Sequence, residues 1–430
     1  PAWADQIPHQ RLIELPTTRV KVEMLRLNVL LVTIPWLCLA QTSCPIKNTI
    51  PSCECQSSAI ICPDAKLTEL PDPSLVPEEF TTLEMDGNSF GELTFVPYPQ
   101  LRALRLRNSG ITSIAENAFS NLTELVELDL SSNLIENILR PMFKGLGKLE
   151  KMILPSNKMK SISAHALCPG LMPNVMHLNL EYNQIEEIQA SNIMYPKLAY
   201  LNLGYNKLSK VPSVIWTKST KIEQLLLEGN PLKTIPAHAF HNLTQIKIVN
   251  ADTCNLTDID NDAFHGVSTV THLYLGNNKL TTFPAAITQP LKNLQELHLQ
   301  NNNLQYVEYD VVRNVKTLRL DHNKWHCDCK IKWMAGLRPS ENNTQYLCTS
   351  PQEVAAKPIS EVLGPMSCKS NRGVIALAIG IPILIICAGL IAFFLWRIAK
   401  ARRAEDKRKS VRYSAVYRDT VEQKQGDVKA

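Results

Sequence analysis

The chain has 430 residues and a formal net charge of +5, with 45% hydrophobic and 20% charged residues. This composition excludes a wholly disordered chain, and 16 Gly with 27 Pro exclude a collagen-like one. The positive charge is concentrated in residues 397–430, which carry 11 basic and 5 acidic side chains. Residues 41–396 carry 30 basic and 32 acidic side chains, a net charge of −2, so no nucleic-acid partner is expected.

The N-terminal region contains a segment typical of a secretory signal peptide. Residues 24–40 begin with Met24 and Arg26, continue through a short apolar stretch and end at Ala40. We expect cleavage after Ala40 and Met24 as the natural start of translation, with residues 1–23 either a translated leader or an artefact of the gene model. The part that follows would face an oxidising exterior, where cysteines form disulfides.

The middle of the chain repeats the pattern L-x-x-L-x-L-x-x-N, in which other aliphatic residues also occupy the Leu positions. Residues 125–133, 198–206 and 294–302 match it in full. Successive units are 21 to 26 residues apart. Their ninth positions are Asn88, Ser109, Asn133, Asn157, Asn183, Asn206, Asn230, Cys254, Asn278, Asn302 and Asn323.

This period predicts an α/β-type solenoid, the leucine-rich repeat horseshoe, with about eleven repeats over residues 80–325. The L-x-L core of each unit is a short strand that buries its apolar face only against stacked neighbours. The Asn amide is expected to hydrogen-bond backbone groups that would otherwise be buried without partners. Ser109 and Cys254 replace that Asn less well, and Cys254 is expected to be a buried free thiol.

Cysteines flank the repeat array where a solenoid would expose its core. Their arrangement in residues 41–79 and 326–368 resembles the N-terminal and C-terminal cysteine caps of extracellular leucine-rich repeat proteins. The resemblance implies the pairs Cys44–Cys55, Cys53–Cys62, Cys327–Cys348 and Cys329–Cys368. Spacing alone leaves three pairings open in each cap. A metal site at His326–Cys329 is the alternative, but disulfides are favoured in an oxidising space, and no metal or other cofactor is expected.

A membrane anchor is expected after the second cap. Residues 373–396 are 24 uncharged, mostly apolar residues, followed at once by a run of Lys and Arg. The positive-inside rule makes residues 397–430 a cytoplasmic tail, so we expect a single-pass type I protein of the plasma membrane. The basic tail would contact the anionic inner leaflet, and Tyr413 with Val416 fits an endocytic sorting signal.

Aromatic and His residues occupy outward positions of the predicted strands in two groups, and these are the candidate ligand-binding residues. Tyr182 and Tyr205 share a template position and are expected to stack. The alternative is that aromatic residues fall on exposed positions without a role. The first group is His177, Tyr182, Tyr200 and Tyr205, and the second is Tyr274 and His298 with His272 and His322.

Four glycosylation sequons lie in the predicted exterior, at Asn121, Asn242, Asn255 and Asn342. Asn121 and Asn242 are expected on the convex side of the solenoid, where glycans would leave the concave face open. Asn255 is expected to be more enclosed because it directly follows Cys254, the ninth position of its unit.

No motif for catalysis is present, so a binding function is expected rather than an enzymatic one. The resemblance implies a cell-surface receptor or adhesion molecule that captures an extracellular protein ligand or co-receptor on its concave face. An auxiliary subunit of a membrane channel or receptor complex is an alternative. Innate-immune pattern recognition is a third, although the 34-residue tail is too short for a folded signalling domain.

Overall fold

The computed structural model describes residues 44–162, 167, 170–188, 195–215, 220–338, 346–368 and 385–409. Several expected features lie outside these ranges. They are the leader and signal peptide, the sequon at Asn342, the first half of the expected membrane span, and the sorting signal at Tyr413 and Val416.

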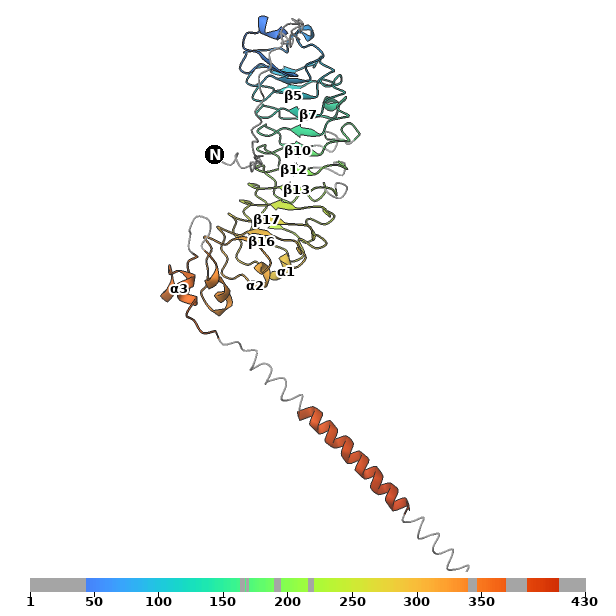
Figure 1. The fold of residues 1–430 in the computed structure, drawn as a ribbon, viewed down its shortest axis with the longest axis vertical. Helices are drawn as coiled ribbons and strands as arrows, with labels where there is room; N and C mark the ends of the chain where they lie inside the picture. Colours follow the sequence, from blue (N-terminus) through green and yellow to red (C-terminus); the bar gives the residue numbers. More distant parts are fainter. Residues whose placement is uncertain are drawn as a thin grey trace, which may run out of the picture. The chain divides into compact units, whose positions relative to one another are not determined.

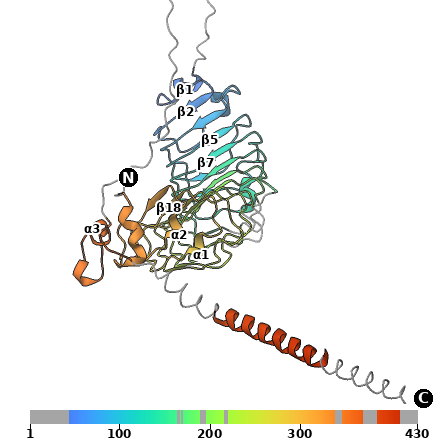
Figure 2. The same cartoon turned by 60° about the horizontal axis from the view of Figure 1, so that its bottom comes forward.

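The described part of the chain forms a β-solenoid built on one 13-stranded sheet (Figure 1). β1 (Glu54–Gln56) pairs antiparallel with β2 (Ala59–Ile61), and every later neighbour pairs in parallel. Figure 2 shows β1, β2, β5 and β7 stacked in sequence order. Eleven parallel strands follow β2 and are separated by ten turns of the solenoid. They are β3 (Thr82–Glu84), β5 (Ala103–Arg105), β7 (Glu127–Asp129), β8 (Lys151–Ile153), β10 (His177–Asn179), β12 (Tyr200–Asn202), β13 (Gln224–Leu226), β15 (Ile248–Asn250), β17 (His272–Tyr274), β18 (Glu296–His298) and β19 (Thr317–Arg319).

The strands are three residues long because only the L-x-L core of each unit is extended. From β3 to β18 the central residue is buried, as Leu104 and Leu201 illustrate. The residues on either side of it point out of the core because side chains alternate along a strand. Burying one such Leu contributes roughly 1.5–3 kcal/mol, and each strand buries its Leu against its two neighbours.

The Asn side chains at the ninth positions form a ladder along the solenoid, as predicted, and they hydrogen-bond backbone groups in the turns between strands. The side-chain amide of Asn133 donates to the carbonyls of Leu106 and Leu130 at 2.7 and 2.9 Å. Its Oδ1 accepts from the backbone N–H groups of Ser109 and Ile111, both at 3.0 Å. The other ladder Asn side chains are buried in the same way.

The two exceptions to the ladder make fewer contacts of this kind. Ser109 Oγ donates to the carbonyl of Met85 at 2.8 Å, and the Phe90 N–H uses the Ser109 backbone carbonyl instead of a side-chain oxygen. Cys254 is a buried free cysteine, as predicted, and its thiol contacts the Leu227 carbonyl at 3.2 Å. Burial raises the pKa of this thiol to about 12, so it stays protonated.

The side of the solenoid opposite the long sheet is made of short strand pairs, helical turns and irregular segments. Stacked Phe rings fill the space behind them, as in Phe240 with Phe264 at 4.8 Å. The pairs are β4 (Glu92–Leu93) with β6 (Ser113–Ile114), β9 (Ser161–Ile162) with β11 (Glu187–Ile188), and β14 (Thr234–Ile235) with β16 (Asp258–Ile259). The helical turns are η2 (Pro73–Leu75), η3 (Arg140–Phe143), α1 (Ala285–Thr288) and α2 (Tyr309–Val312).

Disulfides lie at both ends of the solenoid. The N-terminal end has η1 (Pro45–Asn48), the β1–β2 hairpin and the disulfide Cys53–Cys62, while Cys44 and Cys55 are disulfide-bonded as well. The C-terminal end has η4 (Cys329–Gly336), η5 (Gln352–Val354) and α3 (Ile359–Leu363). Its disulfides are Cys327–Cys348 and Cys329–Cys368, so the cysteines near His326 are covalently paired. The three pairs that are defined here match those implied by the family resemblance.

Residues 385–409 form a helix that begins within the expected membrane span and continues into the basic segment. Across the described ranges, no helix combines the length and the apolar character that crossing a bilayer requires.

Candidate ligand-binding face

The outward positions of the long sheet form the candidate site. In each unit they are the residues before and after the central Leu, and the first two residues after the third Leu position. The parallel register sets His177 beside Tyr200 and Asn179 beside Asn202. Residues that are 21 to 26 apart in the chain therefore become direct neighbours on the concave face of the sheet.

The first predicted group forms two stacked pairs. His177 and Tyr200 stack with ring centroids 4.1 Å apart and planes 1° apart. Tyr182 and Tyr205 stack at 4.4 Å and 10°, as their shared template position predicts. The side chains of this second pair are large and apolar, yet Tyr182 is 51% exposed and Tyr205 is 42% exposed. The repeat thus builds a stacked aromatic pair that is about half exposed to solvent.

Both tyrosines of that surface have a left-handed backbone conformation, with φ of 51° and 52°. Small or polar residues hold the same position in other repeats. They are Gly87, Asn108, Ser132, Ser156, Gly229, Thr253, Asn277, Asn301 and His322. Gly and Asn tolerate positive φ, whereas a bulky side chain there is uncommon and costs on the order of 1 kcal/mol. The sequence therefore carries two strained tyrosines side by side where the fold does not need them.

Gly229 makes room for the tyrosine pair. It occupies the same template position as Tyr205 in the next repeat and has a φ of 73°. A Cβ at Gly229 would lie 2.6 Å from the Tyr205 ring, which is closer than real contacts allow. The ring of Tyr205 therefore rests on the backbone of the next repeat.

Carboxylates that the sequence analysis did not single out lie beside the aromatic pairs. Asn202 Nδ2 donates to Glu181 Oε2 at 3.1 Å. The Glu228 carboxyl group reaches over Gly204, where a Cβ would lie 3.0 Å from Glu228 Cδ. Glu228 Oε2 is buried and has no hydrogen-bond partner within the described residues. Aligning the repeats would have revealed that Glu181, Glu228 and Asp252 share one template position.

Burial changes the acidity of these groups. It raises the pKa of Glu228 to about 7, and the negative charges of Glu181 and Asp252 add to the effect. Burial also raises the pKa of Asp252 to about 6, against the opposing effects of the Gly276 N–H and Arg319. The pKa of Glu181 is raised by burial as well. This part of the face thus holds carboxyl groups that are costly to ionise.

Glu228 predicts that the solenoid loses stability as pH rises from about 5 to about 8. Its pKa of about 7 in the folded protein exceeds its usual 4.5, so the folded state holds a proton that the unfolded state releases. The free energy of unfolding should fall through that window, by on the order of 3 kcal/mol, and level off above it. Asp252 contributes with the same sign at lower pH.

Urea unfolding at several pH values measures this effect, and Glu228→Gln should flatten the upper part of the profile. A variant with the pH slope of the wild type would contradict the assignment.

The second predicted group is also brought together in part. Tyr274 and His298 lie 4.6 Å apart on β17 and β18, and His272 lies 6.2 Å from Tyr274. Glu296, which the sequence pattern does not single out, has carboxyl oxygens 2.8 Å from His298 Nε2 and 3.7 Å from His272 Nε2. Burial and this neighbouring carboxylate raise the pKa of Tyr274 to about 12. His322 stands at a positive-φ position in the last repeat of the array.

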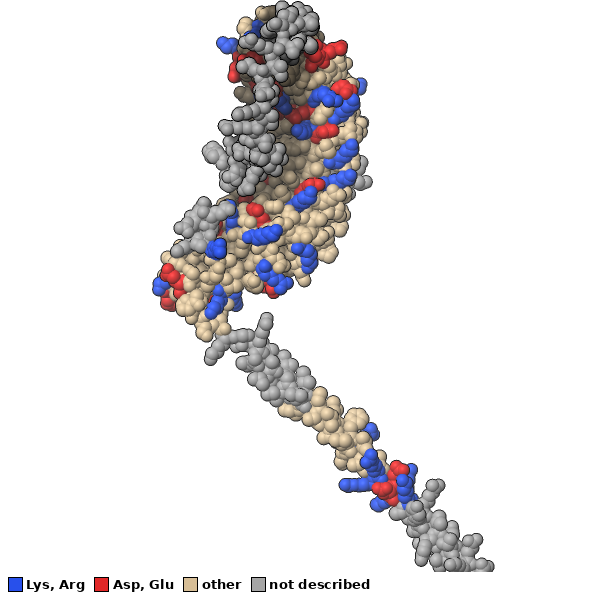
Figure 3. Space-filling model, in the orientation of Figure 1, with Lys and Arg blue, Asp and Glu red and all other residues tan. Residues whose placement is uncertain are grey.

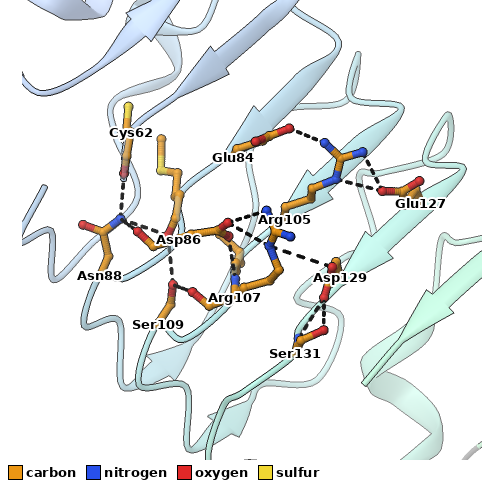
Figure 4. A network of polar contacts seen from close by, with 12 residues as sticks. Cys62, Glu84, Asp86, Asn88, Arg105, Arg107, Ser109, Glu127, Asp129 and Ser131 are labelled. Carbon is orange, nitrogen blue, oxygen red and sulfur yellow. Dashed lines mark hydrogen bonds and ion pairs between the residues drawn. The ribbon is translucent and has the colours of Figure 1, made fainter. Parts of the chain in front are cut away.

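The N-terminal repeats carry a network of ion pairs on the same face (Figure 4). Arg105 lies between Glu84 and Glu127, with its guanidinium 2.7 Å from the latter, and it forms a close ion pair with the former. Arg107 pairs with Asp86 at 2.7 Å. Figure 3 shows the resulting interspersion of basic and acidic side chains over these repeats. The sequence signal for this network is that acidic and basic residues alternate at one template position in successive repeats.

The three sequons within the described ranges are exposed, and none lies on a strand of the long sheet. Asn121 and Asn242 are in loops before β7 and β15. The expectation that Asn255 is enclosed was wrong: the residue is exposed, because the chain turns outward at once after the buried Cys254. Glycosylation of these residues stays a prediction.

Comparisons with known proteins agree with this architecture. The family model described as leucine rich repeat matches residues 99–159, 173–232 and 245–304. The chain is 35% identical to keratocan of Mus musculus over 124 residues, which is 27% of this chain and 34% of keratocan. It is 28% identical to fibromodulin of Homo sapiens over 194 residues, 37% of this chain and 49% of fibromodulin. The chain therefore spans about a third to a half of the length of these curated relatives.

Solved structures share the fold at low sequence identity. One is in the mouse RP105/MD-1 complex, with a TM-score of 0.63, 20% identity, and coverage of 73% of this chain and 54% of that one. Another is in the octameric complex of Latrophilin 3, Unc5D and FLRT2, with a TM-score of 0.53, 21% identity, and coverage of 74% and 99%. The repeat matches show leucine-rich repeats within residues 99–304, and the disulfides at both ends of the solenoid support a leucine-rich repeat family with cysteine caps.

Proposed function

We propose that this protein binds an extracellular protein partner on the concave face of its solenoid, around Tyr182 and Tyr205. The observation that carries the proposal is the stacked, solvent-exposed tyrosine pair at positive φ. Backbone strain concentrates at functional sites, and Tyr is enriched in the energetically important centres of protein interfaces. A pair that is costly to hold and leaves about half of its surface exposed is best explained by a contact with another molecule.

The proposal includes a place at the cell surface, with residues 373–396 as the anchor and residues 397–430 as a basic inner tail. The capping disulfides support an oxidising exterior for the solenoid. The related folds support a protein partner, because RP105 is found in a complex with MD-1, and FLRT2 in a complex with Latrophilin 3 and Unc5D. No enzymatic role is proposed.

The double variant Tyr182→Ala with Tyr205→Ala is expected to weaken partner binding about 100-fold. Truncating a tyrosine at an interface hot spot costs about 2 kcal/mol or more of binding free energy. The experiment uses intact cells that display the full chain and a panel of tagged secreted and cell-surface ectodomains. Antibody labelling without permeabilisation checks surface display of each variant. Leu134→Ala, an exposed apolar residue on a loop outside the long sheet, is the matched control and should bind as the wild type does. Equal binding by the tyrosine variant would remove the proposal.

A further inference from the structure

The two halves of the concave face differ in charge balance. From β3 to β8 the outward positions hold four acidic and three basic residues: Glu84, Asp86, Glu127 and Asp129 with Arg105, Arg107 and Lys151. From β10 to β18 the same positions hold four acidic residues and neither Lys nor Arg: Glu181, Glu228, Asp252 and Glu296. The repeat is the same in both halves, so the missing cations are a property of this part of the sequence.

Two of these carboxylates lack a cation within the described residues. Glu296 contacts two His side chains, and Arg319 acts on Asp252. By contrast, no Lys or Arg of the described ranges forms a salt bridge with Glu181 or Glu228. Glu181 accepts from the Asn202 amide, and Glu228 Oε2 is buried without a hydrogen bond. In the N-terminal half, Arg105 shows how the same face neutralises carboxylates of neighbouring repeats when it supplies its own cation.

The uncompensated carboxylates adjoin the exposed aromatic surface. The charges of Glu181 and Glu228 both act on Tyr205 and on Tyr200, which places the acidic and aromatic groups within one neighbourhood. Gly204 lies between the two acidic residues in template order, and the Glu228 carboxyl group reaches across it. An aromatic plane beside unpaired carboxylates is the chemical complement of a guanidinium group. That group stacks on aromatic rings and donates several hydrogen bonds in its plane.

We propose that the protein partner presents an arginine side chain to this surface, where the guanidinium stacks on the face of Tyr182 that Tyr205 leaves uncovered and donates to Glu181 and Glu228. This inference rests on the proposed function and specifies the chemistry of the partner. The partner's arginine would neutralise the carboxylates here, as Arg105 of the chain itself does in the N-terminal repeats of the same sheet. A lysine would neutralise charge but would neither stack nor donate as well.

The pairing makes affinity depend on pH. The guanidinium favours ionised Glu228, whose pKa is about 7 in the free protein, so affinity should rise as pH increases from about 6 to about 8. The titratable groups that face Glu228 are Glu181, Asp252, Tyr200, Tyr205 and Cys254. The tyrosine and cysteine groups have raised pKa values and stay neutral in this range, and ionisation of the two acids acts in the same direction.

The test uses the full chain in a neutral detergent and fluorescent peptides in which Gly alternates with Arg, or with Lys. The Arg peptide should bind more tightly than the Lys peptide. Glu181→Gln with Glu228→Gln should weaken Arg-peptide binding at least about tenfold, because two charge-assisted hydrogen bonds are lost. Glu186→Gln with Glu187→Gln, which makes the same charge change in an exposed part of the same repeat outside the long sheet, should leave it unchanged.

Two further readouts separate a specific site from general attraction. Tyr182→Ala with Tyr205→Ala should reduce Arg-peptide affinity more than Lys-peptide affinity, and Glu228→Gln alone should remove the rise in affinity between about pH 6 and 8. The inference is overturned if the wild type does not bind the Arg peptide, or if the two glutamine double variants bind it equally. The proposed function is judged separately: a partner that is lost in the tyrosine variant but retained in Glu181→Gln with Glu228→Gln refutes the arginine contact alone.

Discussion

Replacing Asn206 by alanine is expected to lower the free energy of unfolding by about 3–5 kcal/mol. The Asn206 amide donates to the carbonyls of Leu180 and Leu203 at 2.9 and 3.0 Å, and its Oδ1 accepts from the Ile185 N–H at 3.0 Å. Alanine leaves these buried backbone groups without partners, and each unsatisfied group costs about 1–3 kcal/mol. The loss falls in the middle of the array, where each repeat is stabilised only by its neighbours.

Urea unfolding of the full chain in neutral detergent, followed by far-ultraviolet circular dichroism, measures this change. Asn261→Ala is the control, because Asn261 is an exposed residue of the same type and its loss should change stability by less than about 0.5 kcal/mol. If the two variants unfold at the same urea concentration, the ladder does not hold the turns as described.

Removing the disulfide Cys329–Cys368 by a double Ser substitution is the second large effect. The bond closes a segment with a sequence separation of 39, so the chain-entropy estimate of its contribution is about 4 kcal/mol. Trp325 directly precedes the C-terminal cap and is 1% exposed, and its backbone carbonyl accepts from the N–H groups of Thr349 and Ser350 in the cap. Loss of the cap should expose this indole and shift tryptophan fluorescence to longer wavelength at lower urea concentration than in the wild type.

Cys387→Ser is the matched control for the disulfide, because Cys387 is an exposed free cysteine. It should leave the transition where it is. An unchanged fluorescence transition in the Cys329→Ser, Cys368→Ser variant would show that the cap does not depend on this bond.

The solenoid and its buried positions follow from the repeat pattern alone. A unit that recurs every 21 to 26 residues has only one way to bury its Leu and Asn side chains, which is against the same positions of the next unit. Burial in such an array is therefore fixed by spacing, and the pairing of Tyr182 with Tyr205 follows from their shared position. Asn255 marks the limit of this reasoning, because a residue next to a buried position faces outward when the chain turns there.

The interactions among the outward side chains, and their effects on charge and strain, depend on the folded structure. Glu228 reaches across Gly204 toward the acidic and aromatic groups around Glu181, a contact that depends on a missing side chain one repeat away. The stacking of Tyr182 on Tyr205 at positions with a left-handed backbone likewise belongs to the folded turns. The physical reason is that outward side chains are not constrained by close packing. Their charge state, strain and partners depend on the geometry of neighbouring repeats, which the period does not specify.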